Sequence, residues 1–188
     1  MAIDFMVMPM SCYISGDFIT PTMRWAWEQG IPYAVVEPDG KRELPKNSPF
    51  GGTEAAERRG QMVEMILEDL RGLPSEISQH LWDERSKTEH RFHRVDPGSY
   101  QALLEHFSAN PPDETEVAHC IATLFLPCDL EGPLPLTTPL ERIAGATNRA
   151  LEELERSKYP AAAASAAETL RKALEDSAAL RLPMIVDW

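Results

Sequence analysis

The feature that most constrains the fold of this sequence is an apolar, strand-like segment at each end of the chain. At the N-terminus, Ile3, Phe5 and Val7 alternate, and the residues between them are also largely apolar, as in a strand buried on both faces. At the C-terminus, residues 181–188 (RLPMIVDW) contain a second short apolar run. Both runs can be buried together if they pair side by side. We therefore expect the two ends of the chain to lie in one sheet.

A hairpin is expected near residues 33–44. Two β-prone segments there flank Pro-Asp-Gly at 38–40. Proline presets φ for a turn and glycine accepts a positive φ, so this tripeptide favours a tight reversal of the chain. A further short strand is expected at 91–95, after the charge-dense segment 83–91.

Capping residues mark the expected helices, because Ser, Thr and Asp side chains accept hydrogen bonds from the first helical N–H groups. Helices are expected to begin at Thr20, Thr53, Asp96, Asp113 and Thr138. A short helix is expected over 77–82. The helix from Asp113 carries apolar residues at helical spacing over 117–124, although 120–126 (CIATLFL) equally fits a strand. The helix from Thr138, whose start fits a capping box, is expected to carry apolar residues from Leu140 to Leu154 and to end at Tyr159-Pro160.

These elements predict an α+β fold dominated by helices. The length of 188 residues fits one globular domain over 1–188. Its small sheet would contain the N-terminal strand, the hairpin near 33–44 and the C-terminal strand. A proline-rich linker near 127–137 is expected to precede a C-terminal pair of helices, the second rich in alanine.

The charge of the chain restricts its partners. It carries 30 acidic and 18 basic residues, a formal charge of −12, which repels nucleic acid and favours a basic partner. Residues 61–120 hold 12 acids and 5 bases, a difference of −7. No signal peptide and no membrane span are expected, since no apolar run approaches about 18 residues. Three cysteines, an odd number, indicate a reducing compartment, and we expect the cytoplasm.

The histidines are the main candidates for catalysis. His80, His90 and His93 have neither HExxH spacing nor an accompanying CxxC pair, and Arg91 and Arg94 beside them oppose a bound cation. We therefore expect no metal and no cofactor. The alternative to a binding protein is a hydrolase that uses these histidines with nearby acids.

The tryptophans are candidates for a protein interface. Trp25 and Trp27 are two residues apart in the helix expected from Thr20, so their side chains diverge by about 200°. One indole is therefore exposed unless the helix is buried on two sides, and an exposed tryptophan is a common interface anchor. The predicted partner-binding residues are Trp25, Trp27, Asp83, Glu84, Glu105, Asp113, Glu114 and Glu116.

Together these features favour a protein that acts by contact. We expect a non-enzymatic binding protein that neutralises or regulates a partner protein. Its most specific form is an immunity-type inhibitor of a toxin or secreted effector, for which a basic nuclease would be a natural target. A third interpretation is a structural or oligomerisation subunit that uses the C-terminal helices.

Overall fold

The computed structural model describes residues 3–33, 35–36, 42–45, 47–51, 74–84, 87–111, 117–136 and 141–187. Its helices are α1 (Met10–Ser15), α2 (Pro21–Glu28), α4 (Ser75–Asp83), α5 (Pro97–Ala109), α6 (Thr147–Arg156) and α7 (Ala164–Leu180), with short 3₁₀ helices η3 (His119–Ile121) and η4 (Ala161–Ala163). Its strands are β1 (Ile3–Val7), β2 (Val35–Val36), β3 (Arg42–Glu43), β4 (Arg91–Val95), β5 (Leu124–Leu126), β6 (Leu134–Leu136), β7 (Arg142–Ala146) and β8 (Met184–Asp187). The α+β class expected from the sequence is confirmed.

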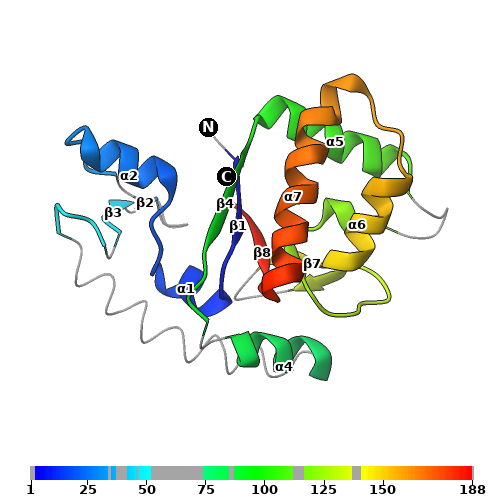
Figure 1. Ribbon diagram of the computed structural model, residues 1–188, viewed down its shortest axis with the longest axis horizontal. Coiled ribbons are helices and arrows are strands. Elements are labelled where there is room, and N and C mark those ends of the chain that lie inside the picture. Colours follow the sequence, from blue (N-terminus) through cyan, green and yellow to red (C-terminus); the bar gives the residue numbers. More distant parts are fainter. Residues whose placement is uncertain are drawn as a thin grey trace.

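The main sheet has six strands in the order β4-β1-β8-β5-β7-β6. Neighbouring strands are antiparallel except β5 and β7, which are parallel. The expected pairing of the two chain ends is confirmed, because β1 pairs with β8 and places Phe5 opposite Val186. The start of β1 and the end of β8 consequently lie side by side, with Asp4 opposite Asp187 (Figure 1).

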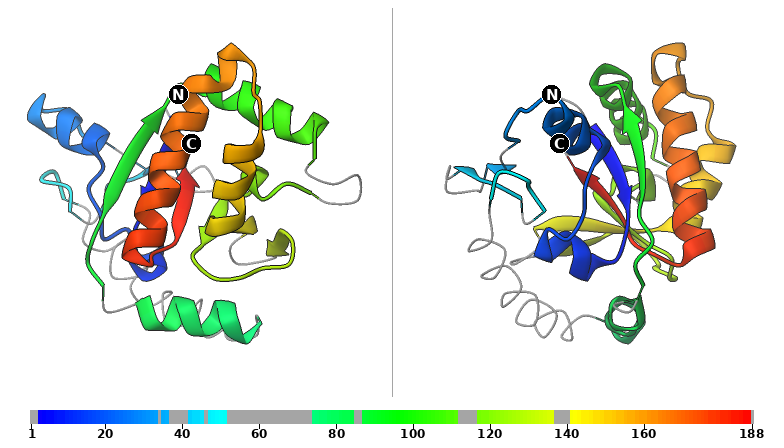
Figure 2. Two further views of the ribbon diagram at one scale, coloured as in Figure 1. Left: turned by 45° about the vertical axis from the view of Figure 1, so that its right-hand side comes forward. Right: turned by 60° about the vertical axis from the view of Figure 1, so that its left-hand side comes forward.

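Alternating side chains along the strands build two cores, one on each face of the sheet. On one face, Phe5 and Val7 pack with the buried sides of α5, α6 and α7. On the other, Met6 and Met8 pack with Ile77 of α4 and with α1. Figure 2 shows the sheet seen nearly edge-on between these two groups of helices.

The hairpin does not belong to this sheet. Strands β2 and β3 pair antiparallel in a separate two-stranded sheet, with Val36 opposite Arg42. The expectation that the hairpin extends the main sheet is therefore corrected, and β4, β5, β6 and β7 supply the additional strands. The turn expected at 38–40 lies outside the described residues.

Two helices begin where the capping residues predict, and a third covers the segment expected to be helical. The Thr20 side chain accepts a hydrogen bond from the N–H of Met23 at 3.1 Å, and Asp96 accepts one from Ser99 at 2.8 Å. Helix α4 begins at Ser75 and covers the expected 77–82. The helix expected from Thr53 lies outside the described residues. No helix in the described part of the chain is long and apolar enough to cross a membrane.

Two segments expected to be helical contain strands. The segment expected to be helical over 117–124 forms one 3₁₀ turn and then enters β5, whose three residues are all buried. The alternative of a strand within 120–126 is therefore the one observed over Leu124–Leu126. Thr138 lies outside the described residues, but its expected helix is interrupted at Glu141, whose φ of 47° is incompatible with a right-handed helix. The chain then forms β7, and α6 begins at Thr147. Both segments are strands because each lies inside the sheet with a hydrogen-bonding neighbour on either side.

The proline-rich segment 127–137 likewise contains a strand, β6, at the edge of the sheet. An edge strand tolerates Pro135 because one side of its backbone has no strand to which it must donate.

Gly145 in β7 allows η3 to approach the sheet closely. A Cβ at this position would lie 2.7 Å from the Cβ of Ala122 and 3.1 Å from the carbonyl oxygen of His119. Both contacts are with parts of the chain that cannot rotate away.

We expect Gly145→Ala to lower the free energy of unfolding by about 1–3 kcal/mol, because the core is overpacked. Urea unfolding followed by circular dichroism measures the change. Gly132→Ala is the matched control, since nothing lies within 4 Å of a Cβ there. Equal losses in the two variants would contradict the assigned role of Gly145.

Candidate functional site

Helix α2 presents Trp25 to the solvent. Its buried residues are Met23 and Ala26, so Trp25 points away from the core and its exposed fraction is 58%. Trp27 is only partly buried, and its indole Nε1 is enclosed with no hydrogen-bond acceptor among the described residues. The expectation that one indole is exposed is confirmed, and the exposed one is Trp25.

A groove of about 610 Å³ lies beside Trp25. Its apolar wall includes Phe18, Ile19 and Phe92, and the acidic residues Asp17 and Glu28 also line it. Two further large apolar side chains from this part of the sequence are exposed, Ile31 at 47% and Phe50 at 45%. We refer to the groove lined by Trp25 and its neighbours, without Ile31 and Phe50, as the α2 groove. An apolar centre with charged residues around it is typical of a protein-binding surface.

A polar network supports one wall of the α2 groove. The Tyr13 ring stacks on Phe18, with ring centroids 6.1 Å apart. The Tyr13 hydroxyl accepts a hydrogen bond from Arg142 at 2.7 Å and donates one to Asp187 at 3.3 Å. Arg142 also donates to the carbonyl of Val186 at 2.8 Å, which ties α1 to the sheet. Burial raises the pKa of Tyr13 and also that of Asp187, and Arg142 opposes both shifts. Sequence reasoning missed this network because its members are far apart in the chain.

Of the predicted acidic residues, Glu84 is buried and Glu105 is exposed in the part of the chain that the structure describes. Glu84 is 1% exposed, and its two carboxylate oxygens lie 3.0 and 3.1 Å from the N–H of Met10, which donates to them. The structure thereby removes Glu84 from the predicted partner surface, because its charge is used inside the fold. Glu105 is exposed on α5 and accepts a hydrogen bond from Gln101 at 3.0 Å. Asp83 ends α4. Asp113, Glu114 and Glu116 lie outside the described residues.

The three candidate catalytic histidines lie in different surroundings. His80 lines a pocket beside α4, and His90 lines the α2 groove. His93 Nε2 lies 2.8 Å from Oδ2 of Asp176 on α7, on the opposite face of the sheet from Phe92. Burial lowers the pKa of His90. Among the described residues, no group of three His, Cys, Asp or Glu side chains could hold a metal ion.

The cysteine and histidine of η3 are structural. Cys120 is fully buried, and its thiol donates to the carbonyl of Ala150 at 3.2 Å. Burial raises the pKa of this thiol well above its ordinary value, so it is a poor nucleophile. His119 is 5% exposed, and its Nδ1 accepts a hydrogen bond from the N–H of Ala146 at 3.0 Å.

No family model, curated protein or solved structure matches this chain. The chemistry of its own residues is therefore the basis for assigning a function. The α2 groove offers an exposed aromatic side chain, apolar walls and charged neighbours, whereas the histidines are separated from one another. This arrangement suits the binding of another molecule better than it suits catalysis.

Proposed function

We propose that this chain is a non-enzymatic binding protein that neutralises a basic partner protein through the α2 groove. Its most specific form is an immunity-type inhibitor of a toxin or secreted effector, acting in the cytoplasm. The single observation that carries the proposal is the 58% exposure of Trp25 beside the groove. A large aromatic side chain held in solvent by a short capped helix has little value for folding and high value as an anchor.

Charge supports the choice of a basic partner. The chain has a formal charge of −12, and two acids, Asp17 and Glu28, line the groove against one base, Arg24. Opposite charges on two proteins steer their encounter and raise the association rate. Trp25 would contribute differently, because desolvation of an apolar anchor on binding mainly slows dissociation.

The hydrolase alternative has less support. A general base and its partner acid must be within hydrogen-bond reach of one another and of a substrate. His93 and Asp176 satisfy the first condition, but His93 lines neither the α2 groove nor the pocket beside α4.

Increased salt is expected to slow association with the partner and to change dissociation much less, since salt screens the charges that steer the encounter. The partner is first captured from the native host with the immobilised full chain and identified by mass spectrometry. Surface plasmon resonance at about 0.05 and 0.5 M salt then measures the association and dissociation rates. Between these two salt concentrations the Debye length falls from above 10 Å to below 8 Å.

Charge-neutralising substitutions at Asp17 and Glu28 should reproduce the effect of salt. Glu168→Gln on α7, whose side chain is 49% exposed, is the control for removal of one surface acid away from the groove. An association rate that responds neither to salt nor to Asp17→Asn and Glu28→Gln would contradict a basic partner at the α2 groove.

A further inference from the structure

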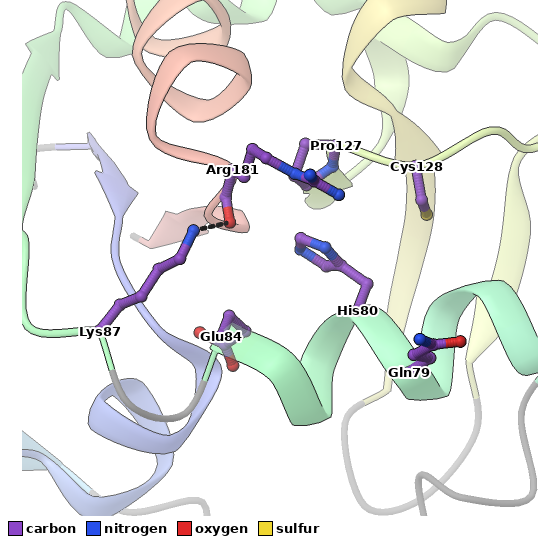
Figure 3. A pocket seen from close by; sticks show the side chains of 7 residues that line it. All are labelled: Gln79, His80, Glu84, Lys87, Pro127, Cys128 and Arg181. Atoms are coloured by element: carbon purple, nitrogen blue, oxygen red, sulfur yellow. Dashed lines mark hydrogen bonds between the residues drawn. The ribbon is translucent and has the colours of Figure 1, made fainter.

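A second pocket lies between α4, the turn that follows α7, and the segment that follows β5. Its volume is about 380 Å³, which is within the range of small-molecule sites. Its charged and polar lining comes from Gln79, His80, Glu84, Lys87 and Arg181. Figure 3 shows the Arg181 guanidinium and the His80 ring pointing into the same space, beside Pro127 and Cys128.

Two of the charges in this pocket are used by the fold. The Glu84 carboxylate accepts the N–H of Met10 and is 1% exposed. Lys87 Nζ donates to the carbonyls of Leu180 at 2.6 Å and Arg181 at 3.1 Å, at the C-terminal end of α7. An ammonium group there is favourable because it faces the negative end of the helix dipole. These carbonyls use two of the three N–H donors of the Lys87 ammonium group.

The Arg181 guanidinium differs from Glu84 and Lys87 in its contacts. Within the part of the chain that the structure describes, no carboxylate forms an ion pair with it. The planar group presents five N–H donors in a fork that matches the oxygens of a carboxylate or a phosphate. Its backbone has a φ of 52° and ends α7 in the left-handed conformation. Glycine is preferred at such a position, so arginine is here despite its backbone cost.

We propose that this pocket is a binding site for a small oxyanion, a molecule with a phosphate or carboxylate group. Arg181 forms the bidentate contact, Lys87 contributes its charge, and His80 lies beside the bound group. The only acid that lines the pocket in the described residues, Glu84, has its oxygens occupied by a backbone N–H. The charge of −12 on the whole chain opposes anions at a distance, but salt screens charges beyond about 8 Å. The nearby cations therefore decide binding.

The test uses Arg181→Gly, because glycine suits the left-handed backbone and the variant retains its fold. Isothermal titration calorimetry with inorganic phosphate and, separately, with succinate measures binding by the full chain at concentrations up to about 10 mM, enough to saturate a site with a Kd near 1 mM. At least one probe is expected to bind with one equivalent. Arg181→Gly should weaken it at least about tenfold, and the control Arg156→Gln, on an 80% exposed side chain of α6, should not.

Alkylation of the cysteines locates the bound anion. Cys128 lines the pocket, whereas Cys12 lies in α1, and both are partly buried. The bound probe should slow alkylation of Cys128 and leave Cys12 unchanged, as measured by peptide mass spectrometry. Binding of phosphate alone identifies a phosphorylated ligand, and binding of succinate alone identifies a carboxylate. No heat from either probe, equal affinities in Arg181→Gly and Arg156→Gln, or no protection of Cys128 would each overturn the proposal.

Discussion

Trp25→Ala is expected to weaken partner binding by at least about 2 kcal/mol, which is about 30-fold in Kd. The indole is 58% exposed in the unbound chain, so the partner gains a large apolar surface when it covers the side chain. Most of this loss should appear as faster dissociation, because removal of an anchor leaves the long-range charges unchanged. Surface plasmon resonance against the identified partner separates the two rates.

The same substitution should leave the fold intact. Trp25 lies outside both hydrophobic core clusters, and the helix that carries it is held by Met23, Ala26 and the Thr20 cap. The free energy of unfolding of the Trp25→Ala variant should therefore differ from that of the parent chain by less than about 0.5 kcal/mol.

Val117→Ala is the control for this experiment, because Val117 is a comparably exposed apolar side chain, at 55%, outside the α2 groove. It should bind the partner normally. If Trp25→Ala bound as tightly as the parent chain, the α2 groove would not be the partner surface, and the proposed function would lose the observation that carries it.

Glu153→Ala is expected to lower the free energy of unfolding by about 3 kcal/mol. One carboxylate oxygen accepts the N–H of His119 and the other that of Cys120, both at 2.9 Å. These two N–H groups begin η3 and have no partner within that short helix. Without Glu153 they would be left unsatisfied beside a buried core, and only the bond from the Cys120 thiol to the Ala150 carbonyl, among those described between η3 and α6, would remain.

Glu152→Ala is the matched control, one residue earlier on the same helix. Its side chain is 45% exposed, and its carboxylate forms weak ion pairs with Arg149, at an N···O distance of 3.8 Å, and with Arg156, at 3.5 Å. Exposed pairs of this kind contribute little, so the loss should be below about 0.5 kcal/mol. Urea unfolding of both variants measures the difference, and similar losses would show that the contacts of Glu153 with η3 do not stabilise the fold.

The adjacent pair Glu152 and Glu153 illustrates why the roles of acidic residues were only partly predictable from the sequence. In the sequence the two residues are equivalent acids on a predicted helix. Their difference depends on η3, which is more than 30 residues away in the chain. Glu84 is a second case, because its partner Met10 is 74 residues away. No local pattern distinguishes a surface acid from one that caps a distant backbone N–H.

Local features determined the elements whose signals lie within a few residues. The caps at Thr20 and Asp96 bond to N–H groups three residues later, so they could be recognised directly. The apolar segments at the two ends of the chain predicted their own pairing, because each needs a neighbouring strand to remove it from solvent. The divergence of Trp25 and Trp27 follows from helical geometry. It left two outcomes, a helix buried on two sides or one exposed indole, and the structure shows the second.

Only the tertiary structure decided the state of the segments that contain β5 and β7. Their apolar residues fit a helix by spacing, yet each lies between two other strands and gains backbone hydrogen bonds on both sides. The tertiary structure likewise decided which acids are buried and that His80 and His90 line different pockets. It also brought Arg181, Lys87 and His80 together at one pocket. The physical reason is the same in each case. Helix caps and turns depend on neighbours in sequence, whereas strand pairing, burial and charge clusters depend on residues that only folding brings together.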